Sequence, residues 1–69
     1  MPIYLAETLT KLIIVQITGD DKIKKHLNNL GIIAGEEVMV VNKVNDNIII
    51  KIKGVSLAIS KELAKRILV

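Results

Sequence analysis

The sequence contains no cysteine, phenylalanine or tryptophan, and it has a single tyrosine, a single proline and a single histidine. Without cysteine, neither a disulfide nor a thiolate zinc site can stabilise the fold, although small domains often depend on one. The lack of aromatic rings excludes an aromatic groove for proline-rich peptides and weakens the case for base stacking on single-stranded nucleic acid. Because 51% of the residues are hydrophobic, stability must come from an aliphatic core.

A chain of 69 residues has room for one small core, so we predict a single domain over residues 1–69. The net charge of +3 comes from interspersed charges, which falls short of the basic stripe of a nucleic-acid binder. The sequence shows no signal peptide and no apolar run near the roughly 18 residues that span a bilayer. We therefore expect a cytoplasmic protein that is not embedded in a membrane.

The segment KLIIVQITG, residues 11–19, alternates as a β-strand does, and both of its faces are largely apolar. One face carries Ile13, Val15 and Ile17, and the other carries Leu12, Ile14 and Gln16. A strand with two apolar faces suits a curled sheet that is covered by a helix or a terminal segment. Another copy of the chain could also cover Leu12 and Ile14, so a homodimer is an open alternative.

The next segment, DDKIKKHLNNLG, has the spacing of an amphipathic helix, with Ile23, Leu27 and Leu30 on one stripe. Asp20 or Asp21 is placed to cap its N-terminus, because a carboxylate accepts the free backbone N–H groups there. Gly31 stands where a helix commonly ends in a left-handed residue. This arrangement predicts a Schellman cap.

Gly31 and Gly35 do not form a phosphate-binding loop. Such a loop lies between a strand and the N-terminus of a helix, whereas these glycines follow a helix and precede a strand. We expect Gly35 to be a turn residue at the start of the strand that follows.

From Val38 the pattern predicts three consecutive strands. The first runs from Val38 to Val44, residues 45–47 form a tight turn, and the second strand points Ile48, Ile50 and Ile52 inward. The third strand, after Gly54, alternates Val55, Leu57 and Ile59 against small polar neighbours.

Ser60 is expected to cap a closing helix, KELAKRIL, with Leu63, Ala64 and Ile67 on its buried stripe. The predicted order is strand, helix, three strands and short helix. The fold class is therefore mainly β (α+β), a small and partly open antiparallel barrel with one helix after the first strand and one at the end.

Candidates for chemistry are few. His26 is the only imidazole, and a lone histidine without nearby ligands is more often a surface residue than a metal ligand. The acidic pairs Asp20, Asp21 and Glu36, Glu37 stand at element starts, where capping and solvation explain them. No Ser/His/Asp set is present, and we predict that the protein is not an enzyme.

Two blocks, LGIIAGEEVMVV (residues 30–41) and LAISKELAKRILV (residues 57–69), resemble the FeoA family, the small cytosolic component of bacterial ferrous-iron transport. The matching positions are Leu27, Leu30, Gly31, Ile32, Gly35, Ala58, Ile59, Leu63, Ala64, Ile67 and Val69. The chain departs from the family at Ala34, where proline is usual, and at Thr8 and Leu9, where a Pro-Gly turn commonly precedes the first strand.

The resemblance implies an SH3-like barrel with an inserted helix, in agreement with the predicted order of elements. It also implies a non-catalytic accessory of iron transport that contacts the cytosolic part of FeoB, a membrane transporter. Transition-metal binding has been assigned to the family, so weak iron binding is an expectation, with no cofactor required. The matched positions support the fold and identify no contact surface. The motif residues we assign to structure are Leu30, Gly31, Gly35, Leu63, Ala64 and Ile67.

Two other functions are alternatives. A stand-alone metal-sensing domain, similar to the C-terminal domain of iron-dependent repressors, is the main alternative, although no helix-turn-helix pattern is present. An RNA-associated module would need a dense basic face. If a partner surface exists, we expect it on the first helix and the neighbouring hairpin, at Lys24, Lys25, His26, Asn28, Asn29, Lys51 and Lys53. These residues could equally form a solvated face.

Overall fold

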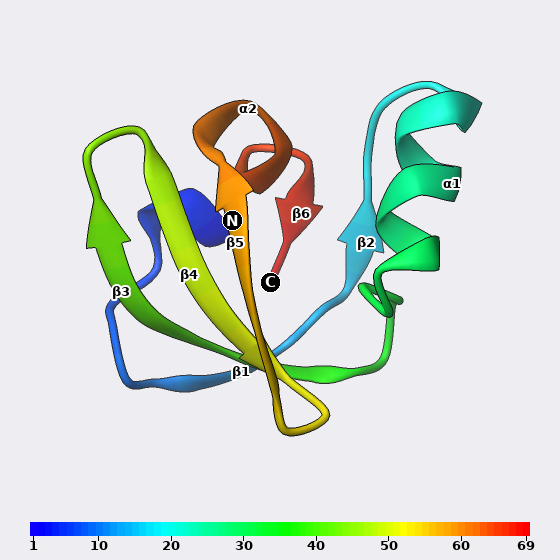
Figure 1. Cartoon of the computed structure of the whole chain (residues 1–69). Coiled ribbons are helices and arrows are strands. Elements are labelled where there is room, and N and C mark those ends of the chain that lie inside the picture. The colour runs from blue at the N-terminus through cyan, green and yellow to red at the C-terminus, as the bar shows by residue number, and fades with distance from the viewer.

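The centre of the molecule is an antiparallel meander of three strands. The computed structural model describes all residues, 1–69, and its main strands are β3 (Glu37–Val44), β4 (Asn47–Ile52) and β5 (Val55–Ser60). A short strand, β1 (Lys11–Ile13), adds to the outer edge of β3, so the strand order is β1-β3-β4-β5 (Figure 1). The predicted run of three strands is confirmed.

Each hairpin turn contains at least one residue with positive φ. The β3–β4 turn has Asn45 at φ 54°, as the sequence predicted for this segment. The β4–β5 turn consists of Lys53 at φ 52° and Gly54 at φ 77°. Positive φ at both central residues of the β4–β5 turn marks it as a type I′ turn, whose twist matches that of the flanking strands.

The inner face of the meander forms the core. Ile48, Ile50 and Ile52 of β4 are buried, as predicted, beside Val38 and Val40 of β3. The register between β3 and β4 shifts between Val40 and Asn42, which is a β-bulge that bends the sheet.

The inward face of β5 is buried only toward its end. Ile59 is buried and Leu57 is half-buried, but Val55 is 54% exposed. Val55 directly follows the β4–β5 turn, where the hairpin extends past the core. The predicted inward trio of this strand is therefore only partly covered.

The prediction of one continuous first strand was wrong. The segment divides into β1 and β2 (Gln16–Ile17), which belong to different sheets. The change of sheet is fixed by hydrogen bonds, since the Ile14 N–H donates to the Glu36 carbonyl (3.0 Å) and the Val15 N–H donates to the Leu68 carbonyl (2.8 Å). Strand pairing of this kind depends on distant residues and leaves no local signal.

Only one of the two apolar faces of this segment is covered, although the sequence predicts cover on both. Ile14 is buried and Leu12 packs half-buried against the core, so their own chain covers them. Ile13 and Val15 are the residues left exposed, at 51% and 64%. A homodimer through Leu12 and Ile14 is therefore not supported.

The inserted helix, α1 (Asp21–Asn29), begins and ends as predicted. The Asp20 carboxylate caps it by accepting the Ile23 N–H at 2.9 Å. At its end the Gly31 N–H donates to the Asn28 carbonyl and the N–H of residue 32 donates to the carbonyl of residue 27, both at 3.0 Å. These two bonds define a Schellman cap with Gly31 at φ 86°.

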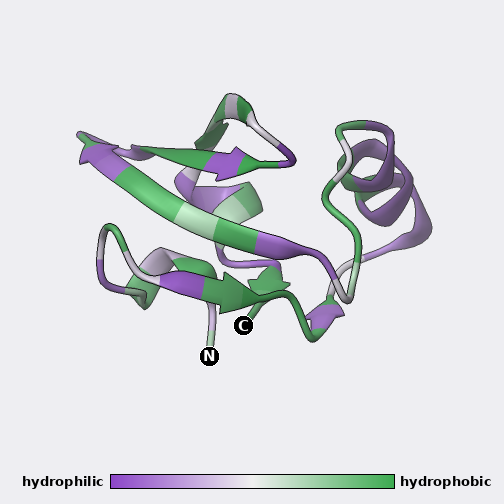
Figure 2. Cartoon of the chain, turned by 90° about the horizontal axis from the view of Figure 1, so that it is seen from below, coloured by the Kyte–Doolittle hydropathy of each residue, from purple (hydrophilic) through white to green (hydrophobic).

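Only part of the predicted helix stripe is buried. Leu27 is fully buried and Ile23 half-buried, while Leu30 is 37% exposed. Figure 2 shows α1 as a largely hydrophilic helix at one side of the molecule.

The closing helix is shorter than predicted. α2 spans Lys61–Ala64, and the Ser60 hydroxyl caps it by accepting the Leu63 N–H at 3.3 Å. The chain then forms β6 (Ile67–Leu68), which pairs with β2. The prediction that the helix continues through Ile67 was wrong, because pairing with β2 outweighs the helical pattern at this point.

The two ends of the chain lie side by side. The N-terminal amine of Met1 donates to the Val69 carbonyl at 2.8 Å, and the Val69 N–H donates to the Met1 carbonyl at 2.8 Å. A short 3₁₀ helix, η1 (Ile3–Leu5), then buries Ile3 against the core. This helix was not predicted. None of the helices is both long enough and apolar enough to span a membrane.

We predict that Gly31→Ala lowers the free energy of unfolding by about 1 kcal/mol, which is the cost of a left-handed conformation for a residue with a Cβ. A Cβ at Gly31 would have no heavy atom within 4 Å, so the cost comes from the backbone alone. Asparagine tolerates this conformation better, and Gly31→Asn should keep most of the stability. Urea unfolding measures both variants, and equal stability of the wild type and Gly31→Ala would contradict the assigned cap.

Candidate binding surface

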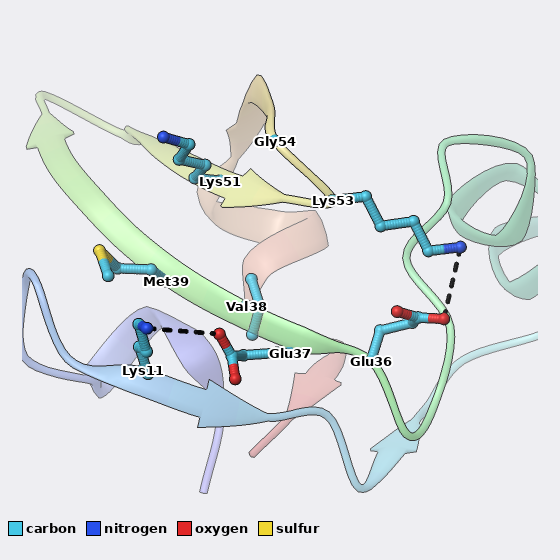
Figure 3. Close-up of a pocket in the computed structure, with 8 residues that line it drawn as sticks. All are labelled: Lys11, Glu36, Glu37, Val38, Met39, Lys51, Lys53 and Gly54. Carbon is cyan, nitrogen blue, oxygen red and sulfur yellow. Dashed lines mark ion pairs between the residues drawn. The ribbon is translucent and has the colours of Figure 1, made fainter.

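The outer face of the sheet carries a shallow depression of about 360 Å³ (Figure 3). It is formed by β1, β3, β4 and the two turns that flank the end of the sheet. Its lining residues are Lys11, Glu36, Glu37, Val38, Met39, Lys51, Lys53 and Gly54. The depression is open and five of its eight lining residues are charged, so it suits a contact with a surface better than it suits an enclosed small molecule.

Strand register brings these side chains together. Lys11 pairs with Met39, and Met39 pairs with Lys51, so the three residues form one row across β1, β3 and β4. Residues paired in this way have side chains on the same face of a sheet. Figure 3 shows Met39 between the two lysines.

The charges of the depression are only partly compensated. The Lys53 ammonium lies 3.3 Å from the Glu36 carboxylate, and the Lys11 ammonium lies 4.0 Å from that of Glu37. Lys51 makes no ion pair. Because the paired groups are largely exposed, each pair contributes little to stability. The depression therefore presents a modest excess of positive charge.

The residues predicted to contact a partner fall into two groups. Both groups are exposed, but no side-chain hydrogen bond or ion pair joins one to the other. The first group lies on α1, and its members are Lys24, Lys25, His26, Asn28 and Asn29. The second consists of Lys51 and Lys53, which line the depression. Figure 1 shows α1 at one side of the molecule, separate from the β4–β5 hairpin.

The residues predicted for metal or acid–base chemistry do not gather. No group of three or more His, Asp or Glu side chains is placed to hold a metal ion. His26 is exposed in the last turn of α1, Asp20 serves as the helix cap, and Glu36 and Glu37 face lysines.

Most of the motif residues assigned to structure lie in turns or against the core. Gly31 and Gly35 have positive φ, at 86° and 95°. Ala64 and Ile67 are fully buried, and Leu63 packs half-buried against the core. Leu30 is the exception, because it is partly exposed at the end of α1.

Sequence reasoning missed Lys11 and Met39 as members of the surface. Alternation along β3 indicates that Met39 points outward, opposite to Val38 and Val40. No local signal shows that β1 pairs with β3, so Lys11 could not be placed beside it.

A small SH3-like domain with an exposed polar surface is the class that this fold and site define. A family model described as the FeoA domain matches residues 1–69. The chain belongs to the FeoA family, which is related to ferrous-iron transport. No curated protein matches the chain.

Solved structures agree with the family. An iron uptake regulatory protein, FeoA, is 31% identical with a TM-score of 0.89, over 97% of this chain and 91% of that chain. FeoA of Stenotrophomonas maltophilia, described as an SH3 domain protein and solved with zinc, is 23% identical with a TM-score of 0.85, over 99% and 87% of the two chains. An identity of 23% supports a conclusion about the fold alone. The likeness to this SH3 domain protein confirms the predicted SH3-like fold.

A manganese-dependent transcriptional repressor also shares the fold, with 13% identity and a TM-score of 0.89. The match covers 97% of this chain but only 39% of the repressor. The SH3-like domain is therefore one part of that larger protein.

Neighbouring residues of β4 should differ sharply in their effect on stability. We predict that Lys51→Ala changes the free energy of unfolding by less than about 0.5 kcal/mol, because Lys51 is exposed and unpaired. Ile50→Ala should cost about 2–5 kcal/mol, because it leaves a cavity in the core. Urea unfolding with both variants checks this, and a large loss in Lys51→Ala would contradict the assigned faces of the sheet.

Proposed function

We propose that the protein is a cytoplasmic, non-catalytic accessory of ferrous-iron transport that acts by contacting the cytosolic part of a FeoB-type transporter. The family match over residues 1–69 is the observation that carries the proposal. The relative that is 31% identical and described as an iron uptake regulatory protein supports it further.

The character of the surface supports a contact role. All buried side chains are aliphatic, and no polar or charged residue is buried, so every group able to act on another molecule lies at the surface. Enzymes usually hold catalytic groups in desolvated pockets that shift their pKa values. A shallow depression and an exposed charged helix face are instead typical of binding surfaces.

The contact surface that we propose is the exposed face of α1, with Lys51 and Lys53 as a second region. Within α1, Lys24 and Lys25 lie close to Lys22 and beside His26, and no ion pair holds any of these three lysines. Unpaired cations on one helix favour a partner surface that carries carboxylates, because opposite potentials speed and orient association.

Charge reversal tests the α1 surface. We predict that the double variant Lys24→Glu/Lys25→Glu weakens binding to the isolated cytosolic domain of the transporter by at least about tenfold, since like charges across an interface are costly. Isothermal titration calorimetry provides the measurement.

A matched control is Lys43→Glu/Lys65→Glu, which makes the same change in net charge on β3 and after α2. Equal weakening in both double variants would show that the loss of binding comes from the overall charge of the protein and not from the α1 surface. If the α1 variant binds the transporter domain as tightly as the wild type does, α1 is not the contact surface. That result would leave the proposed function intact.

The residues of this chain do not fit a resident metal site. His26 is a single exposed imidazole, and no second ligand set surrounds it. Our proposal is therefore that no cofactor is required and that the protein binds transition metals such as iron only weakly.

Anaerobic titration with ferrous iron tests this point. We predict no saturable binding to the wild type and the same result for His26→Ala, because one imidazole cannot complete a coordination shell. Stoichiometric binding that is lost in His26→Ala would instead identify a metal-binding protein.

The alternative function is a metal-sensing domain related to the C-terminal domain of iron-dependent repressors. The shared fold with the manganese-dependent repressor favours it, although 13% identity supports the fold alone. α1 and α2 are separated by three strands, so residues 1–69 contain no helix-turn-helix to enter a DNA groove. Saturable ferrous-iron binding, together with no binding to the transporter domain, would favour this alternative.

A further inference from the structure

The strand β5 is the long free edge of the main sheet. It pairs with β4 on one side only. Apart from β4 and α2, which follows it directly, no element packs closely against it. Figure 1 shows β5 as the last strand of the sheet. Such an edge presents backbone groups that another strand can pair with.

The hydrogen-bond pattern identifies which groups are free. The Lys61 N–H donates to the Asp46 carbonyl at 2.7 Å, and bonded pairs alternate with non-bonded ones along an antiparallel ladder. The register then places Leu57 and Ile59 in bonded pairs with β4. The N–H and C=O groups of Ser56 and Ala58 therefore point away from β4, and no turn, loop or cap hydrogen bond uses them.

The two edges of the sheet differ in how they are protected. Edge strands usually avoid unwanted pairing by being short, charged, bulged or interrupted by proline. β1 follows this rule, because it has three residues and carries Lys11. β5 does not follow it, since its six residues, VSLAIS, include no charge and no proline, and its register with β4 has no bulge.

We infer that two copies of the chain pair through their β5 edges, antiparallel, about a two-fold axis at Ala58. In this register Ser56 faces Ser60 of the second copy, and Leu57 faces Ile59 of the second copy. Small side chains meet small ones on the outer face, and apolar side chains meet apolar ones on the inner face. The strand is thus complementary to itself.

The charges that flank the strand do not oppose this register. Antiparallel pairing brings the β4–β5 turn of one copy toward the start of α2 in the other, where Glu62 has no ion pair in its own chain, and Lys53 of the turn is already paired with Glu36. Lys61, which would otherwise add a like charge there, lies over the Tyr4 ring at 5.2 Å. A second copy therefore fits this edge better than a charged peptide, which would find no charge on β5 to pair with.

Amide hydrogen exchange across a dilution series tests the inference on the wild-type protein. As concentration rises, exchange should slow at Ser56, Ala58 and Ser60. Leu57 and Ile59 are an internal control, because their N–H groups already bond to β4 and should show no such change. Sedimentation equilibrium should show the matching increase in mass.

The variant Ala58→Lys should raise the dissociation constant of the dimer at least about tenfold, because it sets two lysines opposite each other at the axis. Thr10→Lys adds the same charge beside the other edge of the sheet and should leave the dimer unchanged.

Two results would overturn the inference. One is a mass and an exchange pattern that do not depend on concentration. The other is slowed exchange at Ser56 and Ala58 only after the transporter's cytosolic domain is added, which would assign the edge to a partner strand. Neither result bears on whether the proposed transporter contact at α1 exists.

Discussion

The structure depends on keeping the inner face of the β3–β4 hairpin away from water with aliphatic side chains alone. Five residues form the centre of this face: Val38, Val40, Ile48, Ile50 and Ile52. Full burial of a side chain of this size contributes about 1.5–3 kcal/mol, and the protein has no disulfide to add to it. Each remaining element covers part of this face, including η1 through Ile3 and α1 through Leu27.

The need for cover explains the unexpected parts of the fold. The chain leaves the main sheet after β1 so that Ile14 enters the core, and β2 then pairs with β6, which buries Ile67. The bonds between Met1 and Val69 hold both ends of the chain beside this second sheet. Because the whole interior is used for packing, polar side chains are confined to the outside. Every charged group able to contact another molecule therefore lies at the surface.

The sequence predicts most of the helices and strands but not which strands pair with each other. α1 was predictable because its signals are local: Asp20 at the start, the Ile23 and Leu27 spacing, and Gly31 at the end. Alternation likewise identified β3, β4 and β5. The division of the first strand and the strand at Ile67 were not predictable, because both follow from pairing between residues far apart in the sequence, such as Ile17 with Ile67.

The same distinction applies to the candidate surface. The charged face of α1 can be read from the helical pattern alone. The depression cannot, since it requires Lys11, Met39 and Lys51 to align across three strands. Strand register is fixed by turns and by the bulge after Val40, and a small error in register moves a side chain to the other face.

The central claim is that this FeoA-family protein acts through contacts of its surface and not through a catalytic or metal centre. The most direct test is NMR shift mapping of the isotope-labelled protein, first with the cytosolic domain of a FeoB-type transporter and then with ferrous iron alone under anaerobic conditions. The account predicts shifts clustered on the exposed face of α1 with the transporter domain and none with iron. Shifts centred on His26 with iron alone, and none with the transporter domain, would contradict it.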